Sequence, residues 1–225
     1  MSIEQIAFIP TYASVAKRPA FAWQHCIIRG LDISLSLIAL IFVLPVMLLI
    51  IIAIFAEDRG PIFFAHRRVG FRGQIFPCYK FRSMVPDSGA LLEHVLAADP
   101  HARLEWAGCQ KLRRDPRITR VGAFVRKTSL DELPQLINVL LGHMSLVGPR
   151  PIVVEEVPRY GRYFSAYCAQ RPGITGLWQI SGRNHTSYRR RVAIDTFFSR
   201  SLSVQLYLYV LMMTPRAVVS ARGCY

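Results

Sequence analysis

The longest apolar stretch of the chain runs from Ile33 to Ala56 and carries no charged residue. As one straight α-helix it would measure about 36 Å, slightly more than the ~30 Å hydrocarbon core of a bilayer. The stretch starts too late and is too long for a cleaved signal peptide. The pattern therefore predicts one membrane-embedded helix, which we place at residues 31–57.

Two courses through the membrane fit this helix. Pro45 lies in its middle, where a proline removes a backbone hydrogen bond and kinks the helix. Basic residues flank both ends, namely Lys17, Arg18 and Arg29 before it and Arg59, Arg67, Arg68 and Arg72 after it. Because positive residues mark the cytoplasmic side, such flanks favour a re-entrant helix that is broken at Pro45 and returns. A single spanning helix is the alternative.

Strand-like patterns follow the membrane helix. Short aromatic runs on either side of Gly70 and Gly73 predict a β-hairpin, in which Pro77 would take an edge or bulge position. Further along, residues 145–151 and 171–183 are rich in glycine and proline and are interpreted as ordered loops.

Helical patterns occupy much of the remaining chain. They cover residues 88–112, 131–141 and 188–198. The first is interrupted at Asp99-Pro100, and Gly142 ends the second. The apolar residues 202–213 are too few to span a membrane, so they predict either a helix in the membrane interface or a buried core helix. The fold class is therefore α+β and mostly helical, with a re-entrant membrane helix, a short hairpin and a cytosolic core with interfacial amphipathic helices.

Charge and cysteine content restrict the partners and the compartment. The chain has 28 Lys and Arg residues against 14 Asp and Glu, a net charge of +14, and nearly all of this excess follows the membrane helix. Such a charge suits nucleic acid, anionic lipid or phosphorylated small molecules. The 5 cysteines and 6 histidines show no metal-ligand spacing, so neither a zinc site nor a disulfide framework is predicted. A reducing cytosolic compartment is the simplest interpretation.

An adjacent carboxylate pair, Asp131-Glu132, stands out in a chain so poor in acids. Ser129 and Glu132 have the spacing of a capping box, which is the ordinary structural interpretation. That interpretation leaves Asp131 unexplained. Two carboxylates beside Arg126 would suit Mg²⁺ and phosphate together, and a carboxylate can also act as a covalent nucleophile toward phosphorus.

Basic residues in three other segments are candidates for binding phosphate. Arg150 is held between two prolines, a rigid setting for a guanidinium that contacts phosphate. Arg171 and Arg183 bracket a glycine-rich stretch that would let backbone approach a ligand closely. Lys80 and Arg82 lie at the end of the hairpin. Singly each fits a solvated surface charge, but together they predict a polyphosphate site.

One further acid falls within an apolar helical pattern. Asp195 is interpreted as a helix cap, a core ion pair or an inward carboxylate near the site. The residues alone do not choose among these three.

These segments together resemble the bacterial sugar transferases, monotopic phosphoglycosyl transferases that act on polyprenol phosphate and prime exopolysaccharide synthesis. The resemblance covers roughly residues 25–225, and the matching segments are 79–84, 126–136, 144–151 and 171–184. The family's re-entrant helix favours the break at Pro45. One departure is Leu44, where many relatives carry serine before the proline.

The resemblance implies a specific reaction. A hexose 1-phosphate, from UDP-galactose or UDP-glucose, would pass to undecaprenyl phosphate with release of UMP. Asp131 would attack the sugar-linked phosphorus to form an aspartyl phosphosugar intermediate, and Glu132 would hold Mg²⁺. Arg126 and Arg150 would steady phosphate charge, and Asp195 matches an acid in a later helix of the family.

The resemblance also implies a place in the cell. Residues 1–30 would be a cytosolic lead, 31–57 the re-entrant helix and 58–225 a catalytic domain on the cytosolic face of the bacterial inner membrane. The chain would be a minimal member, because larger relatives carry further membrane helices and another domain ahead of this core. We expect membrane lipid as a partner and no nucleic acid, and a homodimer is compatible with the sequence. The alternative is a basic membrane-tethered protein that binds anionic lipid or nucleic acid.

Overall fold

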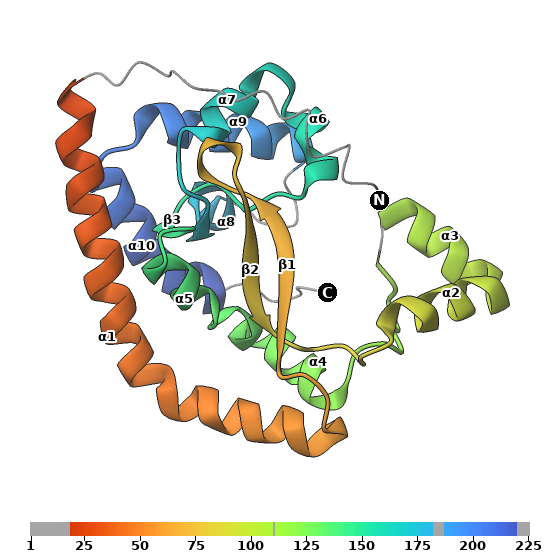
Figure 1. The fold of residues 1–225 in the computed structure, drawn as a ribbon. Coiled ribbons are helices and arrows are strands. Elements are labelled where there is room, and N and C mark those ends of the chain that lie inside the picture. Colours follow the sequence, from red (N-terminus) through yellow and green to blue (C-terminus); the bar gives the residue numbers. More distant parts are fainter. Residues whose placement is uncertain (1–18, 110, 182–186, 220–225) are drawn as a thin grey trace. The chain divides into compact units, whose positions relative to one another are not determined.

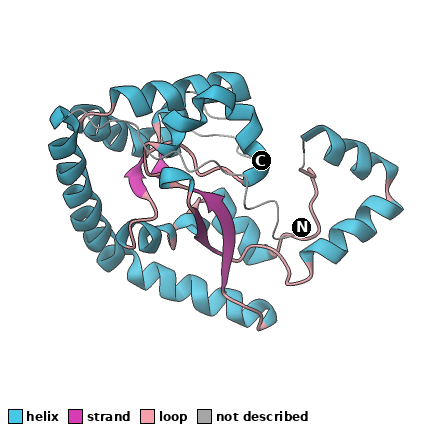
Figure 2. Cartoon of the chain, turned by 45° about the horizontal axis from the view of Figure 1, so that its top comes forward, coloured by secondary structure: helices cyan, strands magenta, loops and turns pink. Residues whose placement is uncertain are grey.

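The structure is a computed structural model and describes residues 19–109, 111–181 and 187–219 (Figure 1). Helices dominate these residues, together with two small two-stranded sheets (Figure 2). The α+β, mostly helical class is therefore confirmed. The described residues fall into two compact units. The first holds those up to Phe42, then Ala65–Tyr79, and those from Gln135 onward, whereas the second holds Val43–Phe64 and Lys80–Pro134.

The helix α1 runs from Pro19 to Asp58 with Pro45 inside it, so it begins well before residue 31. From Trp23 onward it is long and apolar enough to cross a membrane. Most of its apolar surface is uncovered, and Phe42, for example, is 77% exposed. These properties fit membrane association. The chain is helical on both sides of Pro45, and the re-entrant course stays a prediction.

Buried polar contacts hold the first part of α1 against the core of the first unit. Asp32 is buried, and one of its oxygens accepts hydrogen bonds from the Ser145 hydroxyl (2.9 Å), the Leu146 N–H (2.8 Å) and the Tyr207 hydroxyl (2.8 Å). Arg29 donates to the carbonyls at the end of α5 (Gln135–Leu140). Burying a carboxylate in an apolar helix is tolerable because donors satisfy it.

Tyr207 belongs to α10 (Val204–Val219). Its ring and Val210 are fully buried in a cluster with Phe198 of α9 (Tyr188–Ser201), whereas Met212 on another face of α10 is exposed. Of the two interpretations of residues 202–213, the structure therefore shows a core helix, and one of its faces remains open.

A short parallel sheet lies where the sequence predicted only loops. Strands β3 (Ser145–Val147) and β4 (Gly173–Thr175) pair in parallel, with Ser145 opposite Gly173 and Val147 opposite Thr175. The backbones of Gly148 and Gly173 touch, and a Cβ on either would collide with backbone atoms. The loop interpretation was wrong here because the glycines that suggest loops are needed for this close approach. The segment after β4 continues as α8 (Leu177–Ile180).

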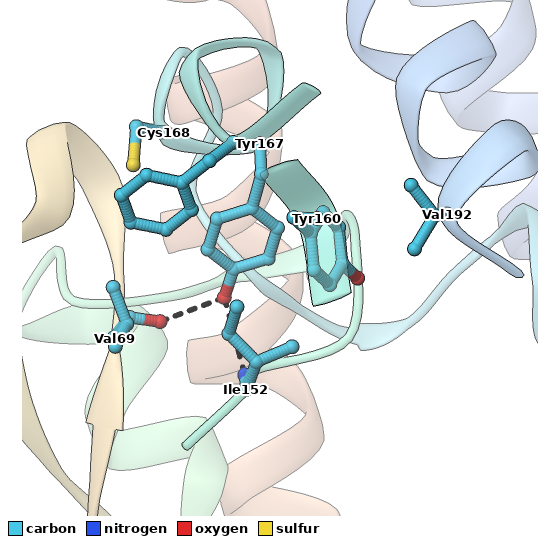
Figure 3. Close-up of a cluster of buried hydrophobic side chains, with 7 residues drawn as sticks. Val69, Ile152, Tyr160, Tyr167, Cys168 and Val192 are labelled. Carbon is cyan, nitrogen blue, oxygen red and sulfur yellow. Dashed lines mark hydrogen bonds between the residues drawn. The ribbon is translucent and has the colours of Figure 1, made fainter. Parts of the chain in front are cut away.

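The predicted hairpin is confirmed by strands β1 (Phe63–Val69) and β2 (Ile75–Phe81). Figure 3 shows how the end of β1 joins the core of the first unit. The Tyr167 hydroxyl donates to the Val69 carbonyl (2.7 Å) and accepts from the Ile152 N–H (3.2 Å). Tyr167 lies on α7 (Phe164–Cys168), and Tyr160 on α6 (Val157–Tyr160) packs beside it.

Three further α-helices lie among the described residues of the second unit. α2 (Ser88–Ala98) and α3 (Pro100–Cys109) pack on each other and are separated at Asp99, as predicted. α4 (Arg120–Lys127) is capped by Thr119, and the Glu57 carboxylate accepts from the N–H of Arg120 (2.8 Å). A Cβ on Gly122 would collide with the Ser83 backbone. α4 therefore lies directly against the segment that follows β2.

Candidate active site

The Asp131-Glu132 pair lies in a tight turn and not in a long helix. α4 ends at Lys127, Ser129 takes a left-handed conformation (φ 58°, ψ 16°), and residues Leu130–Glu132 form one 3₁₀ turn before α5. The turn closes through the N–H of Glu132 and the carbonyl of Ser129 (3.3 Å). The helix expected over 131–141 therefore starts later, at Gln135. The left-handed conformation of Ser129 reverses the chain direction. Pro134 has no N–H, so it cannot donate the α-helical hydrogen bond to the Leu130 carbonyl.

The capping-box interpretation of this segment was wrong. The Ser129 side chain makes no capping hydrogen bond. The Glu132 carboxylate instead accepts from the Lys80 ammonium, with 2.7 Å between Oε1 and Nζ. A non-glycine residue with positive φ carries a conformational cost, and such residues often lie at functional sites. The turn therefore presents both carboxylates to Lys80.

Lys80 joins the two acids electrostatically. Its Nζ lies 3.3 Å from Asp131 Oδ2 as well as 2.7 Å from Glu132 Oε1. The Asp131 side chain is only 12% exposed, whereas the Glu132 side chain is 38% exposed. Burial raises the pKa of Asp131, the charge of Lys80 opposes that rise, and the Glu132 carboxylate adds to it. The site thus contains a buried carboxylate that accepts a hydrogen bond from a cation.

Arg126 is the second cation near Asp131. Its Nε donates to the Ser83 hydroxyl (2.7 Å), which fixes the guanidinium beside the segment that follows β2. Burial lowers the pKa of Arg126, and the nearby carboxylates of Asp131 and Asp115 oppose this. The structure therefore brings together four predicted site residues of the second unit, namely Lys80, Arg126, Asp131 and Glu132.

Arg82 also belongs to the second unit, but it has a different partner. Its Nη2 forms an ion pair with Asp58 at the end of α1, and its side chain packs on the backbone of Gly60. The guanidinium is almost fully buried. The charge of Arg82 is therefore neutralised by Asp58 in this structure. A contact between Arg82 and phosphate stays a prediction.

Arg150 belongs to the first unit and lies in a cluster of arginines and aromatic rings. Arg150 and Arg191 both stack over the Trp178 ring, each 5.6 Å from its centroid. Glu156 accepts from Arg191 (3.2 Å) and lies 4.0 Å from Arg68. Arg68 and Arg191 were not predicted as site residues. The run Arg189-Arg190-Arg191 at the start of α9 is a charge signal, but only the fold shows which of its members turns inward.

Asp195 is a buried acid of the first unit and is 2% exposed. It accepts a hydrogen bond from the Tyr160 hydroxyl (2.8 Å). Burial raises its pKa to about 7, although the Tyr160 hydrogen bond and the charges of Arg191 and Arg150 oppose this. The Asp195 side chain is therefore turned inward, and its place near the site stays a prediction.

The remaining predicted residues are Arg171 and Arg183. Arg171 belongs to the first unit, where its Nε donates to the Gly142 carbonyl (2.9 Å) and its guanidinium stacks over Phe71. It also lines a small pocket beside Arg29 and Asp32. Arg183 lies outside the described residues.

The carboxylate pair is the candidate for a divalent cation. Within residues 19–109, 111–181 and 187–219, no group of three or more His, Cys, Asp or Glu side chains could hold a metal ion. Mg²⁺ is commonly bound through one or two carboxylates with substrate phosphates and water as the other ligands. The pair fits that mode, and Glu132 is the more accessible of the two.

Comparison with known proteins places the chain in a family. Residues 23–221 match the family described as bacterial sugar transferase. The chain belongs to this family. It is 48% identical over 197 residues to the undecaprenyl-phosphate galactose phosphotransferase of Salmonella typhimurium, covering 88% of this chain and 41% of that protein.

Two other relatives differ in length and in the sugar or product that they are named for. The exopolysaccharide production protein ExoY of Sinorhizobium fredii is 45% identical over 197 residues, which cover 88% of this chain and 87% of ExoY. The undecaprenyl-phosphate glucose phosphotransferase of Komagataeibacter xylinus is 35% identical over 222 residues, which cover 93% and 39%. The chain thus spans about two fifths of the two phosphotransferases and most of ExoY.

Proposed function

We propose that this protein transfers a hexose 1-phosphate from a UDP-hexose to undecaprenyl phosphate, releasing UMP, as the first step of exopolysaccharide repeat-unit assembly. The observation that carries the proposal is the Asp131 turn, in which a buried carboxylate lies beside Lys80, Glu132 and Arg126. Family membership and the names of the relatives support the same chemistry.

The reaction proceeds in two displacements. An oxygen of Asp131 attacks the sugar-linked phosphorus of the donor, and the phosphoanhydride bond to UMP breaks, so that UMP leaves with the bridging oxygen. The hexose phosphate is then bound to Asp131 as an acyl phosphate. A phosphate oxygen of undecaprenyl phosphate next attacks the same phosphorus, breaks the bond to Asp131 and restores the carboxylate. One small site can thus serve a soluble donor and a lipid acceptor in turn.

The residues around Asp131 have distinct roles in this proposal. Lys80 favours the ionised, nucleophilic form of Asp131 and neutralises charge near the phosphorus. Arg126, fixed by Ser83, steadies the oxygens of the transferring phosphate. Positioning and charge neutralisation supply most of the catalysis of phosphoryl transfer. Arg150 on its rigid loop is proposed to contact the donor phosphates.

Glu132 is proposed to hold Mg²⁺ together with substrate phosphates. The ion, when bound, would neutralise phosphate charge. Glu132 suits this role because its carboxylate is partly open to solvent while Asp131 is enclosed. Arg171 and Arg183 were predicted to bind phosphate because they bracket a glycine-rich stretch, and Asp195 matches an acid of the family. Their part in substrate binding remains a proposal for each.

The proposed setting is the cytosolic face of the bacterial inner membrane. The uncovered apolar surface of α1 supports membrane anchoring. The re-entrant course and the interfacial placement of other helices, such as the exposed face of α10, are part of the proposal. Galactose is the first hexose to test, since the relative at 48% identity is named for it.

The test is incorporation of labelled hexose phosphate into undecaprenyl phosphate by purified protein, with and without Mg²⁺. Asp131→Asn should abolish transfer, because an amide oxygen is a far weaker nucleophile than a carboxylate. Glu93→Gln on the exposed surface of α2 is the matched control and should retain transfer. The protein exposed to donor alone should gain the mass of a hexose phosphate at residue 131. Transfer by Asp131→Asn would overturn the assignment of the nucleophile.

Parallel assays with UDP-galactose and UDP-glucose identify the donor. We expect one of them to support transfer at a substantially higher kcat/KM. Binding of lipid vesicles or nucleic acid without any transfer would instead support the basic binding protein suggested by the net charge of +14.

A further inference from the structure

A buried ion pair adjoins Arg126. Arg117 donates hydrogen bonds to both oxygens of Asp115, with Nε 2.8 Å from Oδ1 and Nη2 2.7 Å from Oδ2. The backbone N–H of Arg117 also donates to Oδ1 (3.1 Å). Both side chains are almost fully buried. The guanidinium of Arg117 therefore donates a hydrogen bond to each oxygen of this carboxylate, in the bidentate geometry that arginine favours.

The pair is built into the same local structure as Arg126. The Val85 N–H donates to the Arg117 carbonyl (2.9 Å), and the Thr119 N–H donates to the Ser83 carbonyl (3.2 Å). The Ser83 hydroxyl in turn accepts from Arg126. Residues 115–119 thus run along residues 83–85, and Ser83 in that stretch accepts the hydrogen bond from Arg126.

A third contact fixes the orientation of Arg117. Its guanidinium lies over the ring of Trp106 on α3, 4.9 Å from the centroid. With one face of the guanidinium against the Trp106 ring, its Nε and Nη2 atoms point at Asp115. Burial alone would raise the pKa of Asp115, but the hydrogen bonds from Arg117 lower it below its ordinary value, and the charge of Arg126 contributes. Asp115 is therefore an ionised carboxylate with a second arginine close by.

We propose that Arg117 is a positioning residue for Arg126. By occupying both oxygens of Asp115, Arg117 prevents this carboxylate from pairing with Arg126, and the Arg126 guanidinium stays available beside Asp131. Without Arg117, Asp115 would be a buried carboxylate without its ion-pair partner. Arg126, whose charge already acts on Asp115, could then pair with it. The inference rests on the proposed function, since it concerns the arginine that steadies the transferring phosphate.

The kinetic experiment measures kcat/KM for sugar-phosphate transfer. We expect Arg117→Gln to lower it by about 100-fold, the order of loss that a small misplacement of a catalytic group produces. Adding Asp115→Asn should recover most of that loss, because the amide keeps the turn but cannot capture a guanidinium as a carboxylate does. Arg113→Gln, at a side chain that is 95% exposed, is the matched arginine control and should have no effect.

A double-variant comparison distinguishes positioning of Arg126 from a purely structural role of Arg117. Because Arg117 acts through Arg126, Arg117→Gln should cause no further loss of kcat/KM in an Arg126→Gln background. Multiplied losses in that background would overturn the proposal. So would failure of Asp115→Asn to restore transfer in an Arg117→Gln protein whose melting temperature is normal.

An NMR measurement tests the positioning role of Arg117 even if the protein does not transfer sugar phosphate. The ¹⁵N and ¹H shifts of the Arg126 Nε–H group report its hydrogen bond to Ser83. These shifts should move in Arg117→Gln and return when Asp115→Asn is added, whether or not the protein transfers sugar phosphate. Unchanged shifts in Arg117→Gln would overturn the inference. A wild-type protein without transfer, but with the expected shifts, would overturn only the proposed function.

Discussion

At the scale of single residues, Asp131 has to satisfy two opposing demands if it is the nucleophile that we propose. A nucleophile toward phosphorus must be ionised, whereas burial favours the protonated acid and raises the pKa. Lys80, 3.3 Å away, partly cancels the effect of burial. Lys80 therefore favours the ionised form of a carboxylate that burial alone would favour in its protonated form.

This balance predicts a pH dependence of kcat. Since the pKa of Asp131 is raised, the ionised fraction and hence kcat should increase as pH rises through that pKa. Lys80→Met removes the opposing charge, so the midpoint of the acidic limb should move to higher pH and the maximal rate should fall. The measurement is a pH profile of transfer for both proteins. A midpoint that stays in place, or moves to lower pH, would contradict this role of Lys80.

Asp195 predicts a pH dependence of stability with a definite sign. Its pKa in the folded protein is raised from 3.8 to about 7. The folded state therefore binds a proton that the unfolded state has released, and the free energy of unfolding falls as pH rises from about 4 to about 7. The contribution is on the order of 4 kcal/mol for a shift of this size.

Asp195→Asn removes this titration while its amide oxygen still accepts from Tyr160. The variant should lose the part of the pH dependence between about 4 and 7. Denaturant unfolding in detergent micelles at pH 5 and pH 8, with wild type as the reference, measures the difference. Identical pH dependence in both proteins would show that Asp195 does not titrate in this range.

At the scale of elements, the end of α1 is tied to the helix that leads into the site. Glu57 accepts from the N–H groups of Arg120 and Val121, the first residues of α4. A carboxylate at a helix N-terminus satisfies unpaired donors and complements the helix dipole. α4 then continues to Arg126 and to the left-handed turn before Asp131.

Glu57→Ala should lower the free energy of unfolding by about 1 kcal/mol, as the loss of a helix cap typically does. Asp87→Ala is the matched control, since Asp87 precedes α2 but makes no side-chain capping bond. Thermal or denaturant unfolding of the two variants in the same micelles gives the comparison. If both variants lost the same free energy of unfolding, the hydrogen bonds from α4 to Glu57 would not stabilise the fold.

Several elements could be predicted from the chain alone. The apolar run, the hairpin around its glycines and the break at Asp99-Pro100 follow from local rules of pattern and backbone chemistry. β3 and β4 could not, because their pairing joins segments far apart in sequence and each strand has only three residues. The Asp131 turn was also missed, since a left-handed serine leaves no signature in a single sequence.

At the scale of the whole molecule, the course of α1 decides which side of the membrane the site faces. A re-entrant helix would leave both of its ends in the cytosol. The thiol of Cys26 is exposed and offers a native probe before the apolar run, and Arg67→Cys adds an exposed probe after it. With the other cysteines replaced by serine, an impermeant thiol reagent should label both positions only from the cytosolic side. Labelling from opposite sides would establish a spanning helix.

The division between sequence and structure has a physical basis. Apolar length, net charge and the Asp131-Glu132 pair are properties of the chain itself, so they already indicated a membrane helix, an anionic ligand and a candidate nucleophile. Partnerships between distant residues are decided only by folding. Asp32 with Tyr207, Arg82 with Asp58, and Arg117 oriented by Trp106 are examples. Hydrogen bonds and ion pairs depend on ångström-scale placement, and that placement exists only once the core has packed.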